Sequence, residues 1–160
     1  MEDGCKISDM TRLLYRLFAA AIAATILTAC NSEQDQIEKN IYEIAGIWHF
    51  EGNEAGQQVD VYLGFCPVYR TFDLYQKIGE GAYKHFTGSF TMTSSMVLSG
   101  KYDSGISWAR EYTVSRSGSL LKLSAGDYSC EYTSADVIPE DVIDHSVPTR
   151  STDDEDAPVL

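Results

Sequence analysis

The segment Val59-Asp60-Val61-Tyr62-Leu63-Gly64-Phe65 places an aliphatic or phenyl side chain at every second position. The segment Phe72-Asp73-Leu74-Tyr75-Gln76-Lys77 continues this alternation after a short interruption. Successive side chains of a β-strand point to opposite faces, so a period of two marks strands with one face on a core. The two segments therefore predict neighbouring strands of a half-buried sheet.

Strands of the same kind are predicted on both sides of this pair, with turn-forming residues between them. The eight predicted strands lie near Gly46–Phe50, Val59–Phe65, Arg70–Lys77, Ala82–Phe90, Met96–Tyr102, Ser107–Val114, Leu120–Ser124 and Tyr128–Thr133. Short connections favour pairing between neighbours in the chain, and eight such strands can close and leave no exposed edge. We expect an all-β fold over residues 44–142: a small eight-stranded antiparallel up-and-down β-barrel.

An ordered set of short motifs in this region resembles the lipocalin-like domain of small bacterial lipoproteins. The motifs are Gly46-Ile47-Trp48, Asp60-Val61-Tyr62-Leu63, Thr71-Phe72-Asp73-Leu74-Tyr75-Gln76-Lys77, Leu98-Ser99-Gly100-Lys101-Tyr102 and Ile138-Pro139-Glu140. The resemblance covers about residues 46–142 and implies a lipocalin-like barrel that holds a small apolar ligand at its open end. The chain departs from the family where its last strand, Cys130-Glu131-Tyr132-Thr133, offers no arginine to lie over Trp48.

The N-terminal region has the organisation of an export signal. Arg12 and Arg16 precede a charge-free apolar run, Leu17 to Leu27, that is short for a membrane span. The run ends in Leu27-Thr28-Ala29-Cys30, which looks like the lipobox of bacterial lipoproteins. In that family the cysteine thiol is lipidated, the chain is cut before it, and the new amine is acylated with a fatty acid such as palmitate. Residues 1–29 are then a signal peptide with Met10 as a better start than Met1; the alternative is an ordinary signal with a chance cysteine.

Lipid attachment at Cys30 predicts a protein of the bacterial cell envelope, held in a membrane by its N-terminus. Asn31 and the acids that follow favour the outer membrane. Residues 30–43 read as the lipidated N-terminus and a solvated tether. Residues 143–160 are acidic and contain two prolines, which predicts a disordered tail.

Charge and cysteine content limit the function classes further. The chain carries 24 Asp+Glu and 12 Lys+Arg, a net charge of −12, which argues against nucleic acid as a partner. Cys66 and Cys130 remain after the signal, and an oxidising compartment makes them candidates for a disulfide. The alternative is two buried, unpaired thiols.

Signatures of catalysis are absent from the sequence, and we expect no enzyme activity, no cofactor and no metal site. His49 and His85 sit among aromatic residues in predicted strands, and His145 lies in the tail, so they read as ordinary histidines. Asp60 and Asp73 would have to face each other to serve as a catalytic carboxylate pair, whereas acids on solvated strand faces are common.

Aromatic residues are the remaining functional candidates. We predict that Trp108, Arg110 and Tyr112 share one face near a barrel end and, with Tyr83, bind a ligand, because amphipathic rings suit a wet pocket. The alternative is that Trp108 caps the core while Arg110 reaches past it to water. At the level of function, a ligand-binding lipoprotein is the first hypothesis. A protein-interaction module that docks or inhibits an envelope protein is the second.

Overall fold

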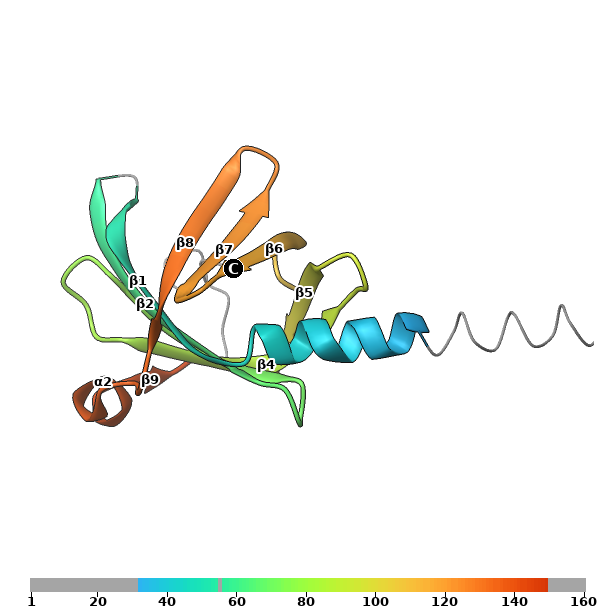
Figure 1. Ribbon diagram of the computed structural model, residues 1–160. Coiled ribbons are helices and arrows are strands. Elements are labelled where there is room, and N and C mark those ends of the chain that lie inside the picture. Colours follow the sequence, from blue (N-terminus) through green and yellow to red (C-terminus); the bar gives the residue numbers. More distant parts are fainter. Residues whose placement is uncertain (1–31, 55, 150–160) are drawn as a thin grey trace, which may run out of the picture. The chain divides into compact units, whose positions relative to one another are not determined.

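The computed structural model describes residues 32–54 and 56–149 (Figure 1). The chain divides into two compact units, Met1–Gln36 and Ile37–Leu160. In the first unit, the described residues 32–36 are helical. The second unit contains every strand. Its elements are β1 (Gly46–Glu54), β2 (Gln57–Cys66), β3 (Thr71–Ile78), β4 (Lys84–Met92), β5 (Val97–Tyr102), β6 (Tyr112–Ser117), β7 (Leu120–Ala125), β8 (Tyr128–Ala135), α2 (Glu140–Asp144) and β9 (Val147–Pro148).

The predicted barrel is confirmed. Each of the strands β1 to β8 pairs antiparallel with the next, and β1 pairs with β8, so the ring closes. The alternation of residues 59–65 appears in the structure as predicted, because Val59, Val61, Leu63 and Phe65 are buried and the residues between them are not. Closure pairs the polar backbone groups that an open sheet would leave on its two edges.

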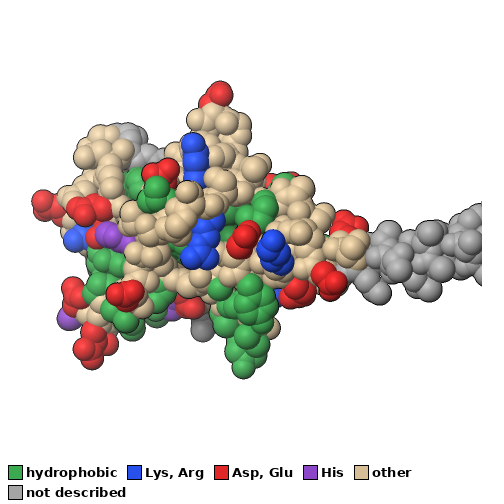
Figure 2. Space-filling model, viewed as in Figure 1, with side chains coloured by type: hydrophobic (Ala, Val, Ile, Leu, Met, Phe, Trp, Pro, Cys, Tyr) green, Lys and Arg blue, Asp and Glu red, His purple; other side chains and the backbone are tan. Residues whose placement is uncertain are grey.

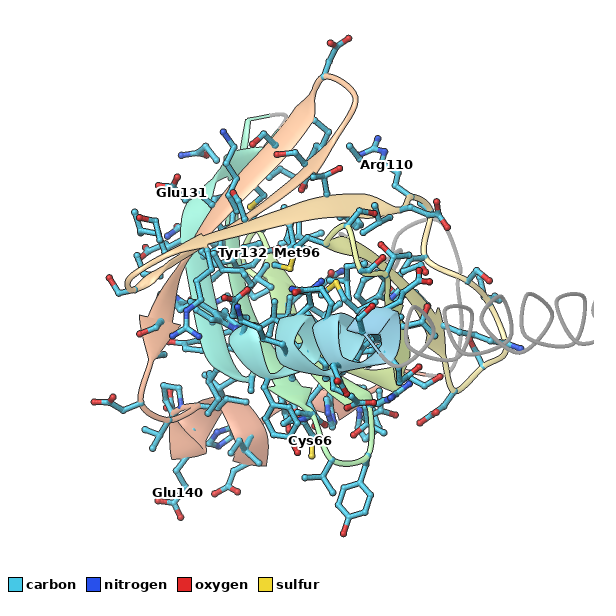
Figure 3. The ribbon with its side chains drawn as sticks, turned by 45° about the vertical axis from the view of Figure 1, so that its right-hand side comes forward. Cys66, Met96, Arg110, Glu131, Tyr132 and Glu140 are labelled. Atoms are coloured by element: carbon cyan, nitrogen blue, oxygen red, sulfur yellow. The ribbon has the colours of Figure 1, made fainter. Side chains whose placement is uncertain are left out.

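Large side chains from opposite strands fill the interior. Trp48, Phe72, Phe90, Tyr112 and Tyr132 are each almost wholly buried and belong to one hydrophobic cluster. An eight-stranded barrel is just wide enough for side chains to fill it, and these rings do so here. Figure 3 shows Tyr132 and Met96 pointing into the interior.

A helix over residues 32–43 replaces the predicted tether, and its residues 37–43 pack against one end of the barrel. Ile41 and the following Ile44 are fully buried in the core cluster. The Asn40 side chain donates to the backbone oxygens of Thr93 and Ser94, at 2.9 and 3.0 Å, in the β4–β5 hairpin. The prediction of a solvated tether was wrong for these residues, because isoleucines spaced along one helix face give the polar segment a buried side.

Trp48 completes the closure of this end. Its indole nitrogen donates to the Ile44 backbone oxygen at 2.8 Å, and the Arg116 guanidinium lies 5.2 Å from the ring centroid. Arg116 also donates to the Glu43 backbone oxygen. The arginine that the last strand lacks is therefore supplied by β6.

The C-terminal segment is also more ordered than predicted. Helix α2 buries Val142, and β9 adds a parallel pairing to β4 through Lys84 and His85. The predicted disordered tail begins too early, since residues 143–149 belong to this ordered segment; residues 150–160 lie outside the described part of the chain. Figure 2 shows acidic side chains scattered over the visible face, consistent with the net charge of −12.

Candidate functional site

A cleft of about 400 Å³ opens in the barrel wall beside β4 and β5. Strands β4 and β5 and the segment between β5 and β6 line it with Ser89, Phe90, Thr91, Ser99, Gly100, Lys101, Ser107, Trp108, Arg110 and Glu111. The cleft exists because β5 and β6 pair through only two residue pairs, Val97 with Thr113 and Leu98 with Tyr112. The wall is therefore incomplete at this point.

A bulge before β6 shapes the cleft. The chain leaves β5 through a tight turn, and the Trp108 backbone nitrogen then donates to the Gly100 oxygen at 2.9 Å. Tyr112 pairs with Leu98, so the three residues 109–111 stand opposite the single residue Ser99. A bulge of this kind interrupts the ladder and redirects side chains. The strand predicted at Ser107–Val114 consequently begins at Tyr112.

Trp108 forms the inner wall of the cleft. Its ring lies against Gly100, where a Cβ would come within 2.2 Å of the indole Cε2 atom. The rings of Phe72 and Tyr112 lie 5.0 and 6.1 Å away, and Trp108 is only 6% exposed. Its indole nitrogen is buried and has no hydrogen-bond acceptor within the described part of the chain. A buried N–H without an acceptor costs about 1–3 kcal/mol.

The outer rim of the cleft is polar. Arg110 is exposed and its guanidinium lies 4.8 Å over the ring of Tyr128. Figure 3 shows Arg110 at the edge of the barrel, directed away from the interior that holds Tyr132. Lys101 and Arg110 provide two positive charges against the single negative charge of Glu111. The cleft is thus a small basic area on an acidic protein.

The structure brings three of the four predicted ligand residues together. Trp108 and Arg110 line the cleft, and Tyr112 packs behind Trp108 in the core. Arg110 does not share their face as predicted, because the bulge turns it outward; its position over Tyr128 fits the alternative in which Trp108 caps the core. Tyr83 is elsewhere, between β3 and β4, where its hydroxyl donates to Asp60 at 2.6 Å.

Tyr83 belongs to a polar group on the outer wall. His49 bonds the second Asp60 oxygen at 2.8 Å and stacks on Tyr62 at 4.3 Å. Burial, and then the hydrogen bond to Asp60, raises the pKa of the Tyr83 hydroxyl well above its ordinary value. A separate pocket of about 300 Å³ next to this group is lined by Gln58, Asp60, Lys77, Gly79 and Glu80.

His49 and His85 each bond a different aspartate on the outer wall and do not converge. His49, Tyr62, Tyr75 and His85 form one cross-strand row over β1 to β4, so the histidines stand three strand spacings apart, about 14 Å. Asp73 bonds His85 at 2.9 Å, while Asp60 bonds His49. In the described residues, no group of three metal-ligating side chains occurs.

Neither Cys66 nor Cys130 takes part in a disulfide, so the predicted bridge between them is not formed. Cys130 belongs to the buried core cluster, whereas Cys66 follows the buried Phe65 and therefore faces the other side of the sheet. Cβ vectors that point apart do not allow a disulfide. Both residues carry thiols outside any disulfide, as in the alternative, although only Cys130 is buried.

The predicted lipid-attachment residue, Cys30, lies outside the described residues. None of the helices in the described part has the length and apolar character of a bilayer span. No family model, no curated protein and no solved structure matches this chain. The resemblance of its motifs to lipocalin-like lipoprotein domains therefore stays a prediction.

Proposed function

We propose that this protein is a lipid-anchored protein of the bacterial envelope that binds a small ligand in the wall cleft and performs no catalysis. The observation that carries the proposal is the buried indole N–H of Trp108, which has no acceptor within the described residues and belongs to a side chain that lines the cleft. A ligand whose hydrogen-bond acceptor reaches this nitrogen would offset the free-energy cost of burying its N–H.

The lining residues indicate the ligand's chemistry. Phe90, Gly100 and Trp108 present an apolar surface, and Lys101 and Arg110 stand at the rim. A small, largely apolar molecule with one carboxylate matches both features, because guanidinium groups bind carboxylates through charge-assisted hydrogen bonds. The proposed ligand therefore belongs to the small apolar class expected from the sequence, but it also carries an anionic group. The proposed site lies in the barrel wall, whereas the sequence predicted a site at the barrel mouth.

Direct titration tests the proposal. A chain beginning at Ser32 is titrated with decanoate and with the neutral decanol, and tryptophan fluorescence is followed. We expect a saturable change with both, which Trp108→Phe removes. Arg110→Gln should weaken decanoate about fivefold, the equivalent of ~1 kcal/mol, and leave decanol nearly unchanged.

Lys122→Gln is the matched control, since Lys122 is exposed on β7 and does not line the cleft. It should bind both compounds like the wild type. No response to either compound, from a protein that is still folded, contradicts the ligand-binding proposal.

The membrane anchor is proposed from the sequence alone. Leu27-Thr28-Ala29-Cys30 after a charge-free apolar run is its support. Cys30→Ala should move the protein into the aqueous phase of a detergent partition or leave its signal uncut. If variant and wild type both enter the aqueous phase, the anchor proposal is wrong.

A protein-interaction module is the second candidate, favoured by the C-terminal segment. Val137, Ile143 and Val147 are large apolar residues that remain exposed there. Cross-linking in cells from a photoreactive residue placed at position 143 would test it. A single discrete adduct supports this candidate, and no adduct leaves the cleft as the favoured site.

A further inference from the structure

We propose that the tip of the β2–β3 hairpin, Val68 and Tyr69, inserts into the lipid surface next to the protein's anchor. This inference rests on the proposed lipid anchor at Cys30. It adds a second membrane contact, made by the folded domain itself.

The tip is the most exposed apolar feature in the described part of the chain. Val68 is 70% exposed and Tyr69 is 78% exposed. In Figure 2 a hydrophobic knob projects at the lower edge, where the β2–β3 hairpin lies in Figure 1. Together they form a small apolar surface, and burial of that surface against a lipid layer would remove it from water.

The structure holds this tip in a fixed position. Arg70 adopts a left-handed backbone conformation, with φ of 54°, which costs a non-glycine residue roughly 1–2 kcal/mol. The Arg70 guanidinium pairs with the Glu38 carboxylate on the helix, and its backbone oxygen accepts from the Phe90 nitrogen at 2.9 Å. Arg70 is thus held by its side chain and by its backbone, and the turn that it closes directs Val68 and Tyr69 outward.

The length of chain between Cys30 and Glu38 limits how far the tip can lie from the lipid proposed at Cys30. Glu38 follows Cys30 by eight residues, which span at most about 29 Å even when fully extended. Because Glu38 contacts Arg70, the hairpin tip stays close to any membrane that holds a lipid on Cys30. A lipid surface is thus the partner that the proposed anchor brings within reach of the tip.

The charges favour a zwitterionic lipid surface. A chain with a net charge of −12 is repelled by anionic headgroups. Glu38 pairs the positive charge of Arg70, so the tip offers an apolar contact instead of an ionic one. Tyrosine is suited to the headgroup boundary because its ring is apolar and its hydroxyl can stay wet.

Depth-sensitive fluorescence quenching tests the contact. The lipidated full-length protein is reconstituted into phosphatidylcholine vesicles that carry a quencher on the upper acyl chain. Tyr69→Trp is compared with Ile106→Trp, which places a tryptophan at another exposed apolar site, 45% exposed. Successive hairpins of an up-and-down barrel lie at alternate ends, so the β5–β6 hairpin with Ile106 is at the other end.

We expect the tryptophan at position 69 to be quenched at least about twofold more than the one at position 106, with both corrected for the buried Trp48 and Trp108. Val68→Trp should behave like Tyr69→Trp, which guards against a folding defect in one variant. Equal quenching at positions 69 and 106 overturns the hairpin contact and leaves the anchor intact. Failure of the wild-type protein to float with the vesicles overturns the anchor and the hairpin contact together.

Discussion

The indole of Trp108 occupies the space that a side chain at position 100 would take, because Gly100 faces the barrel interior directly beneath it. The close approach seats Trp108 between the core and the cleft. Three rings, those of Trp108, Phe72 and Tyr112, then pack in edge contacts across the interior. The glycine is thus required by the packing of the tryptophan rather than by the backbone.

Gly100→Ala should destabilise the protein by about 1–3 kcal/mol, since the new methyl group forces the indole out of its place. Urea unfolding of the variant and the wild type measures this change in the free energy of unfolding. Gly64→Ala is the matched control, because a Cβ there has no atom nearer than 3.9 Å, and it should be neutral or slightly stabilising. In a Trp108→Val background the cost of Gly100→Ala should fall sharply. An unchanged cost would contradict the described packing.

Asn40→Ala should lower the free energy of unfolding by about 2 kcal/mol. The side chain is buried and makes two hydrogen bonds to the β4–β5 hairpin, at Thr93 and Ser94. Tyr42→Ala on the same helix, at an exposed position, should change stability by less than about 0.5 kcal/mol. Equal small effects from both variants would show that the helix does not pack on the barrel.

Alkaline pH should destabilise the protein through its buried tyrosines. Burial raises the pKa of Tyr132 well above its ordinary value of 10.0. Above pH 10 the unfolded chain loses this proton while the folded protein keeps it, so stability falls as pH rises, by about 1.4 kcal/mol per pH unit for one such group. The difference in unfolding free energy between Tyr132→Phe and wild type should be constant below pH 9 and should shift in favour of the variant above pH 10. A pH-independent difference would contradict the burial of this hydroxyl.

Thiol labelling should find both cysteines of the barrel reduced. Unfolding without a reductant should expose two reactive thiols, from Cys66 and Cys130, in a chain that begins at Ser32. In the folded protein Cys66 should react first, because Cys130 lies in the core. If the unfolded chain showed no reactive thiol, the result would contradict this prediction and support the disulfide.

The barrel could be predicted because alternation is a local signal. Residues 59–65 show which face each side chain takes without reference to any other strand. The helix at residues 32–43 was not predicted, because its sequence is mostly polar. The spacing of Ile37, Ile41 and Ile44 becomes informative only once the barrel end that buries these side chains is known. Arg116 and Trp48 are 68 positions apart in the sequence, so no local pattern predicts their contact.

The candidate site was predicted in part for the same reason. Trp108, Arg110 and Tyr112 alternate as a continuous strand would, and the sequence therefore places them on one face. The bulge that separates them arises from where β5 pairs with Trp108 and with Tyr112, which depends on register. The glycine opposite Trp108 was the available signal, because a strand glycine often marks a close approach.

The central claim is that a ligand reaches Trp108 in the wall cleft. The chain has two tryptophans, so an amide correlation NMR spectrum of the ¹⁵N-labelled protein shows two indole N–H signals. Trp48 donates to Ile44 at 2.8 Å and serves as the internal reference. Titration with decanoate should shift the Trp108 signal downfield and saturably while the Trp48 signal stays in place. If the Trp108 signal does not move at any decanoate concentration that leaves the protein folded, the cleft is not a binding site for this ligand class and the account is wrong.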